Sequence, residues 1–193
     1  MNQNQKRKAI VGLFVSLTAI GGIALREGFE KNAMIPVPGD VPTYGYGSTV
    51  KADGSHVELG DSISRLDAQK LLVDTANKTY ADGIKKCVPD LVLTQYEFDF
   101  LVDSAYNLGV SRICNSGIIT KFRAGDYAGG CEVIRRYKFI GKRDCTIPAN
   151  KCGGIPKDRE RAYNICMRGD YGISSREKAA ITAKRVQEST VSD

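Results

Sequence analysis

A glutamate and a threonine near the N-terminus are the residues best suited to chemistry. Glu27 lies in the sequence Arg-Glu-Gly-Phe of residues 26–29, and Thr43 opens the sequence Thr-Tyr-Gly-Tyr-Gly of residues 43–47. Cleaving a glycosidic bond needs a carboxylic acid that protonates the leaving oxygen, and a second group that activates water or stabilises the cationic sugar. An apolar run precedes Glu27, and apolar surroundings keep such an acid protonated. The glycines would let a sugar chain approach the backbone closely.

The elements that must position these residues are a small sheet and a set of helices. Residues 43–50 and 56–59 read as two strands joined by a turn at Asp53-Gly54, which predicts a β-hairpin. Capping-box patterns at Ser64 and Thr94 then open helices expected at 64–86 and 94–109. In the first of these helices the apolar positions expected to be buried are Leu66, Leu71, Leu72, Ala76 and Tyr80.

Shorter helices are expected at 116–124, at 126–137 and at 157–168, where Gly169 ends the last of them. The fold class is therefore α+β, with a small β-hairpin or sheet lobe and a larger helical lobe that flank a cleft. The organisation expected is an N-terminal segment (1–25), one catalytic domain (26–172) and a polar tail (173–193), in which 175–186 could form a short helix.

The N-terminal segment has the pattern of a membrane signal-anchor. Lys6, Arg7 and Lys8 precede residues 9–25, which carry no charge, and a basic stretch before an apolar run is typical of secretory signals and anchors. As a helix this run would span ~25 Å, short of the ~30 Å hydrocarbon core, so it should hold in a membrane only marginally. Cleavage near Ala24 would cut beside Glu27, which favours an uncleaved anchor. The alternative is an ordinary buried helix.

Composition limits the class of protein and of partner. Of the 193 residues 42% are hydrophobic and 26% are charged, which excludes a disordered or collagen-like chain. The net charge of +6 favours a polyanionic partner, which nucleic acid, anionic lipid or an acidic cell-wall polymer would satisfy. With His56 as the single histidine and no CxxC pair, no metal site or cofactor is expected, and His56 itself reads as a surface residue of the hairpin.

The six cysteines fit three disulfides formed in an oxidising compartment. Cys145 and Cys152 are the most probable local pair by spacing, and the sequence leaves the other pairings open. The alternative is that several cysteines are reduced core residues.

The motifs together resemble the phage-type lysozymes, or endolysins, of the T4 lysozyme-like family. The resemblance covers residues 26–172. It rests on Glu-Gly-Phe (27–29), Thr-Tyr-Gly-Tyr-Gly-Ser-Thr (43–49), Ala-Tyr-Asn-Leu-Gly (105–109), residues 118–122, Ala-Gly-Asp-Tyr (124–127), Arg-Arg-Tyr (135–137) and Lys-Asp-Arg-Glu-Arg (157–161). The basic-flanked N-terminal run resembles the signal-anchor-release segment of endolysins that the host's secretion machinery exports.

The resemblance implies a catalytic set of glutamate, aspartate and threonine. Glu27 matches the proton donor, and Thr43 matches the threonine that positions the attacking water. The family's spacing would put the aspartate at Pro36 or Val37, depending on the end from which it is counted. Asp40 is the one acid between Glu30 and Asp53, so it becomes the candidate through a shifted loop, with a turn aspartate as the alternative.

The implied reaction is hydrolysis, with inversion, of the bond between N-acetylmuramic acid and N-acetylglucosamine in peptidoglycan, which lyses the host cell. The implied enzyme is a monomer, held inactive at the inner membrane by its anchor and active in the periplasm after the anchor is released and refolds onto the domain. No cysteine lies in the anchor, so a thiol switch has no residue to use there.

Other functions remain open at this point. A lytic transglycosylase also uses one glutamate but forms an anhydro-sugar without water. An inactive, membrane-tethered cell-wall binding protein would explain the missing aspartate spacing. A nucleic-acid binder fits least, because the basic residues are dispersed and no recognition motif is present.

Overall fold

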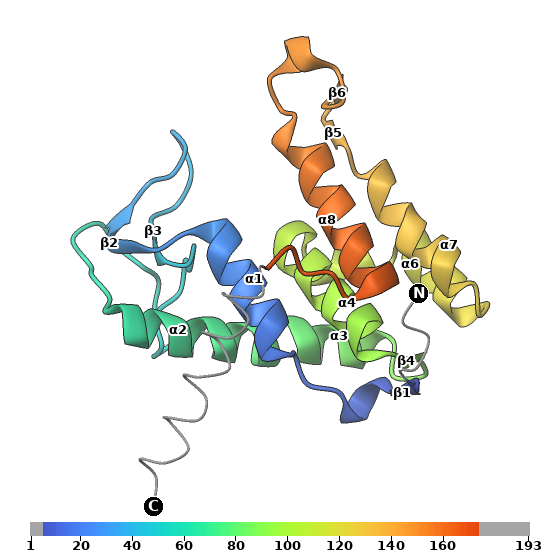
Figure 1. Cartoon of the computed structure of the whole chain (residues 1–193). Helices are drawn as coiled ribbons and strands as arrows, with labels where there is room; N and C mark the ends of the chain where they lie inside the picture. The colour runs from blue at the N-terminus through green and yellow to red at the C-terminus, as the bar shows by residue number, and fades with distance from the viewer. Residues whose placement is uncertain (1–5, 174–193) are drawn as a thin grey trace, which may run out of the picture.

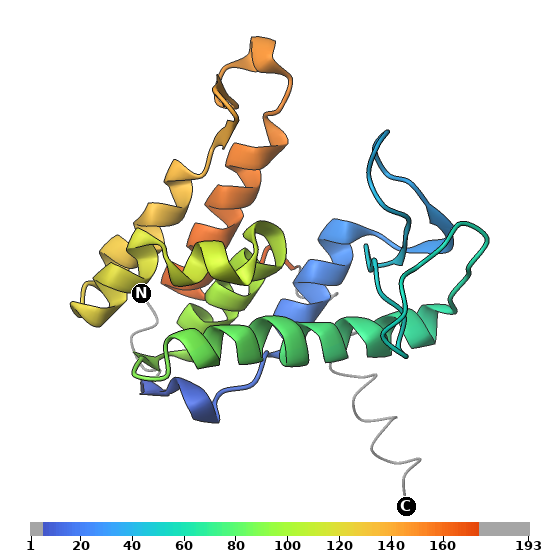
Figure 2. The same cartoon turned by 180° about the vertical axis from the view of Figure 1, so that it is seen from behind.

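A small β lobe and a larger helical lobe lie at opposite ends of one long helix in the computed structural model, which describes residues 6–173 (Figure 1). The long helix consists of α2 (Arg65–Asp74), a π-helical stretch η2 (Thr75–Ala81) and α3 (Asp82–Cys87). Figure 2 shows it running along the base of the molecule from one lobe to the other. The α+β fold class predicted from the sequence is confirmed.

The long helix follows its prediction in extent and departs from it in detail. Ser64 caps it, since the Ser64 hydroxyl accepts a hydrogen bond from the Asp67 amide. Leu72 and Ala76 are buried as expected. Leu66 is 53% exposed, so its predicted burial is wrong. Leu66 is two positions, or about 200° around the helix, from Ala68, which is 2% exposed, so Leu66 lies on the solvent side of the first turn.

The sheet of the β lobe uses a strand that the sequence pattern did not show. Strand β2 (Glu30–Met34) pairs antiparallel with β3 (Thr43–Gly45), in a register that joins Glu30 to Gly45 and Met34 to Thr43 with an irregularity between them. The predicted hairpin over 43–59 is present only in its central part, where residues 49–51 pair with 55–57 through two backbone hydrogen bonds and a bridge between Val50 and His56. Its turn at Gly54 is as expected, with the Gly54 amide bonded to the Lys51 carbonyl.

The helical lobe is built around α4 (Gln95–Leu108), against which its other elements pack. The predicted capping box is present, because the Thr94 hydroxyl and the Glu97 carboxylate each accept the other residue's backbone N–H. Phe98, Phe100 and Leu101 are completely buried. Around α4 lie α5 (Val110–Cys114), α6 (Gly117–Arg123), α7 (Tyr127–Val133), the 3-10 turn η3 (Ile134–Arg136) and α8 (Gly154–Arg168).

Helix α8 begins at Gly154, earlier than the predicted start at residue 157. Pro156 therefore lies inside its first turn, a position that a proline tolerates because the amides there have no partner within the helix. Gly169 ends the helix in a left-handed conformation, with φ of 64°, as its sequence position predicted.

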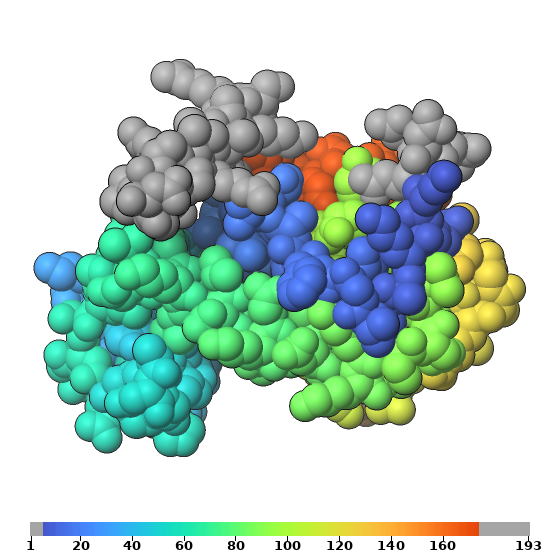
Figure 3. All heavy atoms as spheres, turned by 90° about the horizontal axis from the view of Figure 1, so that it is seen from below, coloured from blue at the N-terminus to red at the C-terminus, as the bar shows by residue number. Residues whose placement is uncertain are grey.

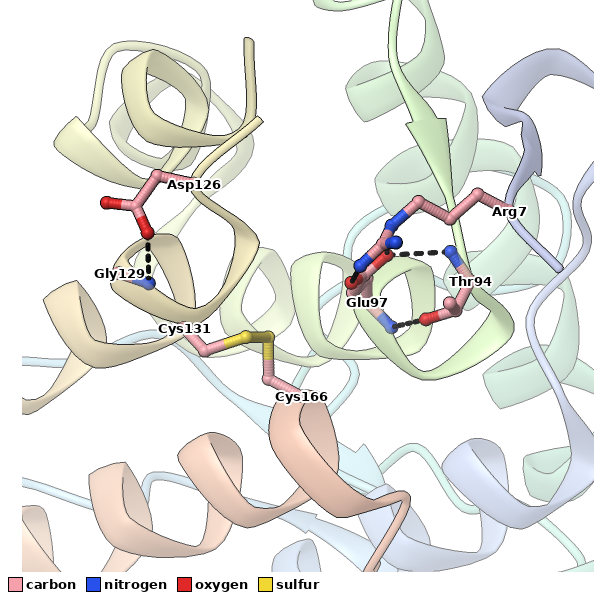
Figure 4. The surroundings of a disulfide bond; sticks show 7 residues. All are labelled: Arg7, Thr94, Glu97, Asp126, Gly129, Cys131 and Cys166. Carbon is pink, nitrogen blue, oxygen red and sulfur yellow. Dashed lines mark hydrogen bonds and ion pairs between the residues drawn. A yellow bond between two sulfur atoms is a disulfide. The ribbon is translucent and has the colours of Figure 1, made fainter. Parts of the chain in front are cut away.

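Three disulfides tie the helical lobe together, as the even cysteine count predicted. They join Cys87 to Cys114, Cys131 to Cys166 and Cys145 to Cys152. The Cys145–Cys152 pair, predicted from spacing, closes an arm formed by β5 (Phe139–Ile140), β6 (Arg143–Asp144) and the turn η4 (Pro148–Asn150). The Cys131–Cys166 pair joins α7 to α8 (Figure 4).

The N-terminal segment packs as part of the domain in this structure. It forms β1 (Lys8–Ala9), the 3-10 turn η1 (Ile10–Gly12) and α1 (Leu17–Glu27), and its buried side chains include Ile10, Ile20 and Ile23. Ser16 caps α1 by accepting a hydrogen bond from the Ala19 amide. Within residues 6–173, no helix combines the length and the apolar character needed to cross a bilayer.

One short stretch of the helical lobe, residues 91–99, receives most of this segment. Strand β1 pairs with β4 (Val92–Leu93), and the Ile10 amide bonds to the Leu91 carbonyl. Arg7 holds the buried Glu97 carboxylate with two hydrogen bonds of 2.7 and 3.2 Å (Figure 4). In Figure 3 the dark blue segment lies across the green surface of these helices.

Asp99 fixes the start of α1 from inside the core. Its carboxylate accepts hydrogen bonds from the Ser16 amide at 3.0 Å and from the Tyr171 hydroxyl at 2.5 Å. Burial raises the pKa of Asp99, and these hydrogen bonds oppose the rise. Ile173 is buried too, so the core reaches one residue into the expected tail, while the rest of that tail, with the helix expected at 175–186, lies outside the described residues.

Candidate active site

Glu27 is the last residue of α1, at the point where the chain leaves the helix for the β lobe. Gly28 ends the helix with φ of 71°, a conformation that favours glycine, and strand β2 follows. The Glu27 side chain is 28% exposed. Its Oε1 accepts a hydrogen bond of 3.0 Å from Nε of Arg26. Its Oε2 lies 3.7 Å from the position that a Cβ would occupy on Gly47, so the carboxylate faces the glycine turn of the β lobe.

Arg26 connects Glu27 to a compact network of charged side chains. Nη1 of Arg26 binds Oδ1 of Asp103 at 2.7 Å and approaches Asp158 at 3.8 Å. Arg161 binds Asp103 at 2.7 Å and Asp158 at 2.9 Å. The network thus connects α1, α4 and α8 next to the candidate acid.

The network carries balanced charge, and its arginines are only slightly exposed. Burial on its own would lower the pKa of Arg26, but the charges of Asp103, Glu27 and Asp158 raise that pKa above its ordinary value. Burial lowers the pKa of Arg159, which binds Asp158 at 2.6 Å and the Asn107 side chain at 2.8 Å.

A tyrosine of α4, Tyr106, joins the two lobes, and Tyr80 packs beside it. The Tyr106 hydroxyl donates a 2.9 Å hydrogen bond from α4 to the Tyr46 carbonyl of the β lobe, and the Tyr80 and Tyr106 rings lie 4.9 Å apart. Burial, and after it the charge of Glu27, raise the pKa of both Tyr80 and Tyr106. Both hydroxyls are therefore neutral donors at ordinary pH.

A cavity of about 670 Å³ opens next to this junction, between the β lobe and the long helix. Tyr46 and Gly47 line one side of it, and Tyr80 and Tyr106 line another. Gly47, the residue that Oε2 of Glu27 faces, thus lines the cavity, while Glu27 itself is not among the lining residues.

The other predicted site residues lie in the β lobe. Thr43 is the half-buried first residue of β3, on the strand that leads directly to the glycine turn. Asp40 is exposed in the loop between β2 and β3, where its Oδ1 accepts a hydrogen bond from the Val41 amide at 2.9 Å. Among residues 6–173, no hydrogen bond or ion pair joins Asp40 to Glu27 or to Thr43. His56 is exposed on the loop, away from these contacts, as expected.

Sequence reasoning gave no role to the residues that hold Glu27 in place. Arg26 and Arg161 were visible only as parts of motifs, and Asp103 only as a position in the helix expected at 94–109. The available signal was the presence of an arginine beside the acid in residues 26–29 and of two arginines in residues 157–161. No group of three or more side chains from the described part of the chain has the arrangement of a metal site.

Comparison with known proteins places the chain among phage lysozymes. It is 29% identical to an endolysin of Bacillus phage B103 over 164 residues, which cover 84% of this chain and 57% of that protein. It is 34% identical to a SAR-endolysin of Escherichia phage 933W over 64 residues, which cover 33% of this chain and 36% of that protein. The chain therefore spans 57% of the length of the first relative and 36% of the length of the second.

The fold agrees with the sequence comparison. The solved structure of an endolysin from Escherichia coli O157:H7 phage FAHEc1 superposes with a TM-score of 0.67 at 24% identity, covering 82% of this chain and 96% of that one. The phage lysozyme family matches residues 24–150, a range that contains Glu27, Asp40 and Thr43. On this evidence the chain belongs to the phage lysozyme family.

Proposed function

We propose that the chain is an endolysin that hydrolyses the β-1,4 bond between N-acetylmuramic acid and N-acetylglucosamine in peptidoglycan and so lyses the host cell. The observation that carries this proposal is the position of Glu27, at a helix end between the lobes, with one oxygen on Arg26 and the other facing Gly47 at the edge of the cavity. Family membership supports the same reaction class.

In the proposed mechanism Glu27 donates a proton from Oε2 to the glycosidic oxygen as the bond to the sugar carbon breaks. Thr43 holds the attacking water, and Asp40 accepts the proton that this water loses. Attack from the face opposite the leaving group inverts the sugar. Asp40 is exposed, so its carboxylate is open to the solvent from which the water comes.

The proposed partner is the glycan strand of the cell wall. The net charge of +6 suits a polymer that carries peptide carboxylates. The enzyme is proposed to act as a monomer.

Analysis of the products tests this proposal against its nearest alternatives. Purified peptidoglycan digested with the full chain is expected to yield muropeptides with a free reducing muramic acid, because water is the acceptor. Mass spectrometry checks this. Products lighter by one water at the muramic acid would identify a lytic transglycosylase instead. Retention of the chain on the wall with no soluble product would identify a binding protein.

We further propose that residues 9–25 first anchor the chain in the inner membrane and then dock as the structure has them, which releases active enzyme into the periplasm. The match to a SAR-endolysin supports this. So does the exposure of apolar side chains in the docked segment, where Val11 is 59% and Phe14 is 72% exposed. In the docked fold both side chains remain largely in solvent, although the Lys85 ammonium lies 4.8 Å from the centre of the Phe14 ring, whereas a lipid environment would cover them.

This exposure allows a test that leaves the docked fold unharmed. Val11→Asp with Phe14→Asp is expected to abolish retention in the membrane fraction, because an aspartate in a membrane helix costs about 2.5–3.5 kcal/mol. The purified variant is expected to keep its activity and thermal stability. Leu59→Asp adds the same charge at a site that is 63% exposed outside the segment, and should leave retention unchanged. Equal membrane retention of the double variant and the wild type would contradict the anchor.

A further inference from the structure

Arg26 contacts Glu27 with only part of the edge that arginines elsewhere in this chain use for a carboxylate. Arg7, Arg123 and Arg135 each hold one carboxylate through Nε and Nη2 together. In Arg26 the Nε binds Oε1 of Glu27, but Nη2 is buried and has no hydrogen-bond partner among the described residues. A buried donor without a hydrogen-bond partner costs free energy of desolvation, so its position beside the candidate acid indicates a functional role.

The guanidinium of Arg26 cannot turn to satisfy this donor. Its Nη1 is held by Asp103, and the second oxygen of Asp103 is held in turn by Arg161. The Asp103 side chain is only 4% exposed. The moving partner must therefore be Glu27, whose side chain is partly exposed and has no other hydrogen bond among residues 6–173.

We propose that Arg26 is the positioning residue for Glu27, and that its idle Nη2 binds the Glu27 carboxylate once the proton has left. This inference rests on the proposed function. Because Nε donates to Oε1, that oxygen accepts a hydrogen bond, and the transferable proton is carried by Oε2 on the side of Gly47. In the protonated acid one guanidinium hydrogen bond is made; in the anion a small rotation of the carboxylate makes two.

The chemistry balances around this rotation. The O–H bond of Oε2 breaks, a new O–H bond forms on the glycosidic oxygen, and that oxygen keeps the electron pair of the broken bond to the sugar. Water supplies the hydroxyl that replaces it. The negative charge left on Glu27 then meets both donors of the Arg26 edge. An interaction that strengthens as the proton leaves lowers the barrier, whereas one that is equal throughout does not.

Two arginines of this chain supply a matched pair of variants for a test. Arg26→Lys and Arg123→Lys each replace an arginine whose Nε binds a carboxylate, but Arg123 binds the exposed Asp90 and lies outside the network around Glu27. With solubilised peptidoglycan as substrate, Arg26→Lys is expected to lower kcat by about 10–100-fold, since a lysine offers a single donor point where the anion needs two. KM should change by less than about twofold, because substrate binding is not altered. Arg123→Lys should lower kcat by less than about threefold at a similar melting temperature.

The outcomes separate this inference from the proposed function. Equal losses of kcat in both variants, or a loss carried by KM, would overturn the role of Arg26. Full activity of Glu27→Gln would overturn the proposed function itself. If Arg26→Lys fails to fold, the Arg Nε–H NMR signals of wild type and Glu27→Gln provide the readout. The Arg26 signal is expected to shift between them while that of Arg123 does not, and an unmoved Arg26 signal refutes the contact.

Discussion

Glu27→Gln is expected to slow peptidoglycan cleavage by about 10²–10⁴-fold, the range that a positioned general acid contributes. The amide has nearly the shape of the carboxylic acid, and its oxygen still accepts the hydrogen bond from Arg26, but it has no proton to give. The side chain is partly exposed and packs against a glycine turn, so the fold should persist. Clearing of outer-membrane-permeabilised Gram-negative cells, followed by turbidity, measures the rate, and circular dichroism checks the fold.

Glu30→Gln is the matched control. Glu30 is exposed on strand β2, three residues further along the chain, and pairs through its backbone with Gly45. The same chemical change there removes the same charge from the same lobe without touching Arg26. It should leave the rate close to that of the wild type. If both variants lyse cells at the wild-type rate, Glu27 is not the acid; if both fail equally, lost charge and not lost proton donation explains the effect.

The helical lobe could be predicted from the sequence because its signals are local. A capping box needs only Thr94 and Glu97, and the buried positions of α4 recur at helical spacing within the same stretch of chain. The stop at Gly169 is equally local. Each of these patterns can be recognised within one short segment of the sequence, and the structure confirms them.

The sheet could not be predicted in the same way. Strand β2 has the sequence Glu-Lys-Asn-Ala-Met, in which four residues are exposed and no apolar alternation exists. It is a strand because β3 lies beside it, and pairing across a loop leaves no trace in the spacing of either segment. For the same reason the predicted hairpin over 43–59 is present only between residues 49–51 and 55–57, while its first residues form β3 and pair with β2, which precedes them in the chain.

The N-terminal run is ambiguous for a physical reason. A segment that must enter a membrane and a helix that fills a core both require apolar side chains on most faces. In the docked segment Ile20 and Ile23 face the core, while Leu17 and Leu25 are exposed. Composition alone cannot separate these surfaces, because both are apolar.

The support of Glu27 lay beyond sequence reasoning because its members are far apart. Arg26 and Asp103 are separated by 77 positions, and Asp103 and Arg161 by 58. Each looks like an ordinary surface charge until the helices pack. The sequence motifs therefore identified the candidate acid. Its supporting residues could be identified only from the tertiary contacts of α1, α4 and α8.

Asp103→Asn is expected to lower the free energy of unfolding by about 3–5 kcal/mol, the cost of removing one partner from a buried ion pair. Both of its oxygens accept from arginines at 2.7 Å, so the amide would turn an N–H group toward a cation and leave a buried positive charge without compensation. Urea unfolding at pH 7, with the slope unchanged, measures the loss.

Asp90→Asn is the control: it breaks the exposed pair with Arg123, and solvent screening makes that loss much smaller. Adding Arg161→Met to Asp103→Asn removes the surplus cation and should restore part of the stability, which a double-mutant cycle quantifies. Equal losses of unfolding free energy for Asp103→Asn and Asp90→Asn would show that the network around Arg26 stabilises the fold no more than a surface ion pair does.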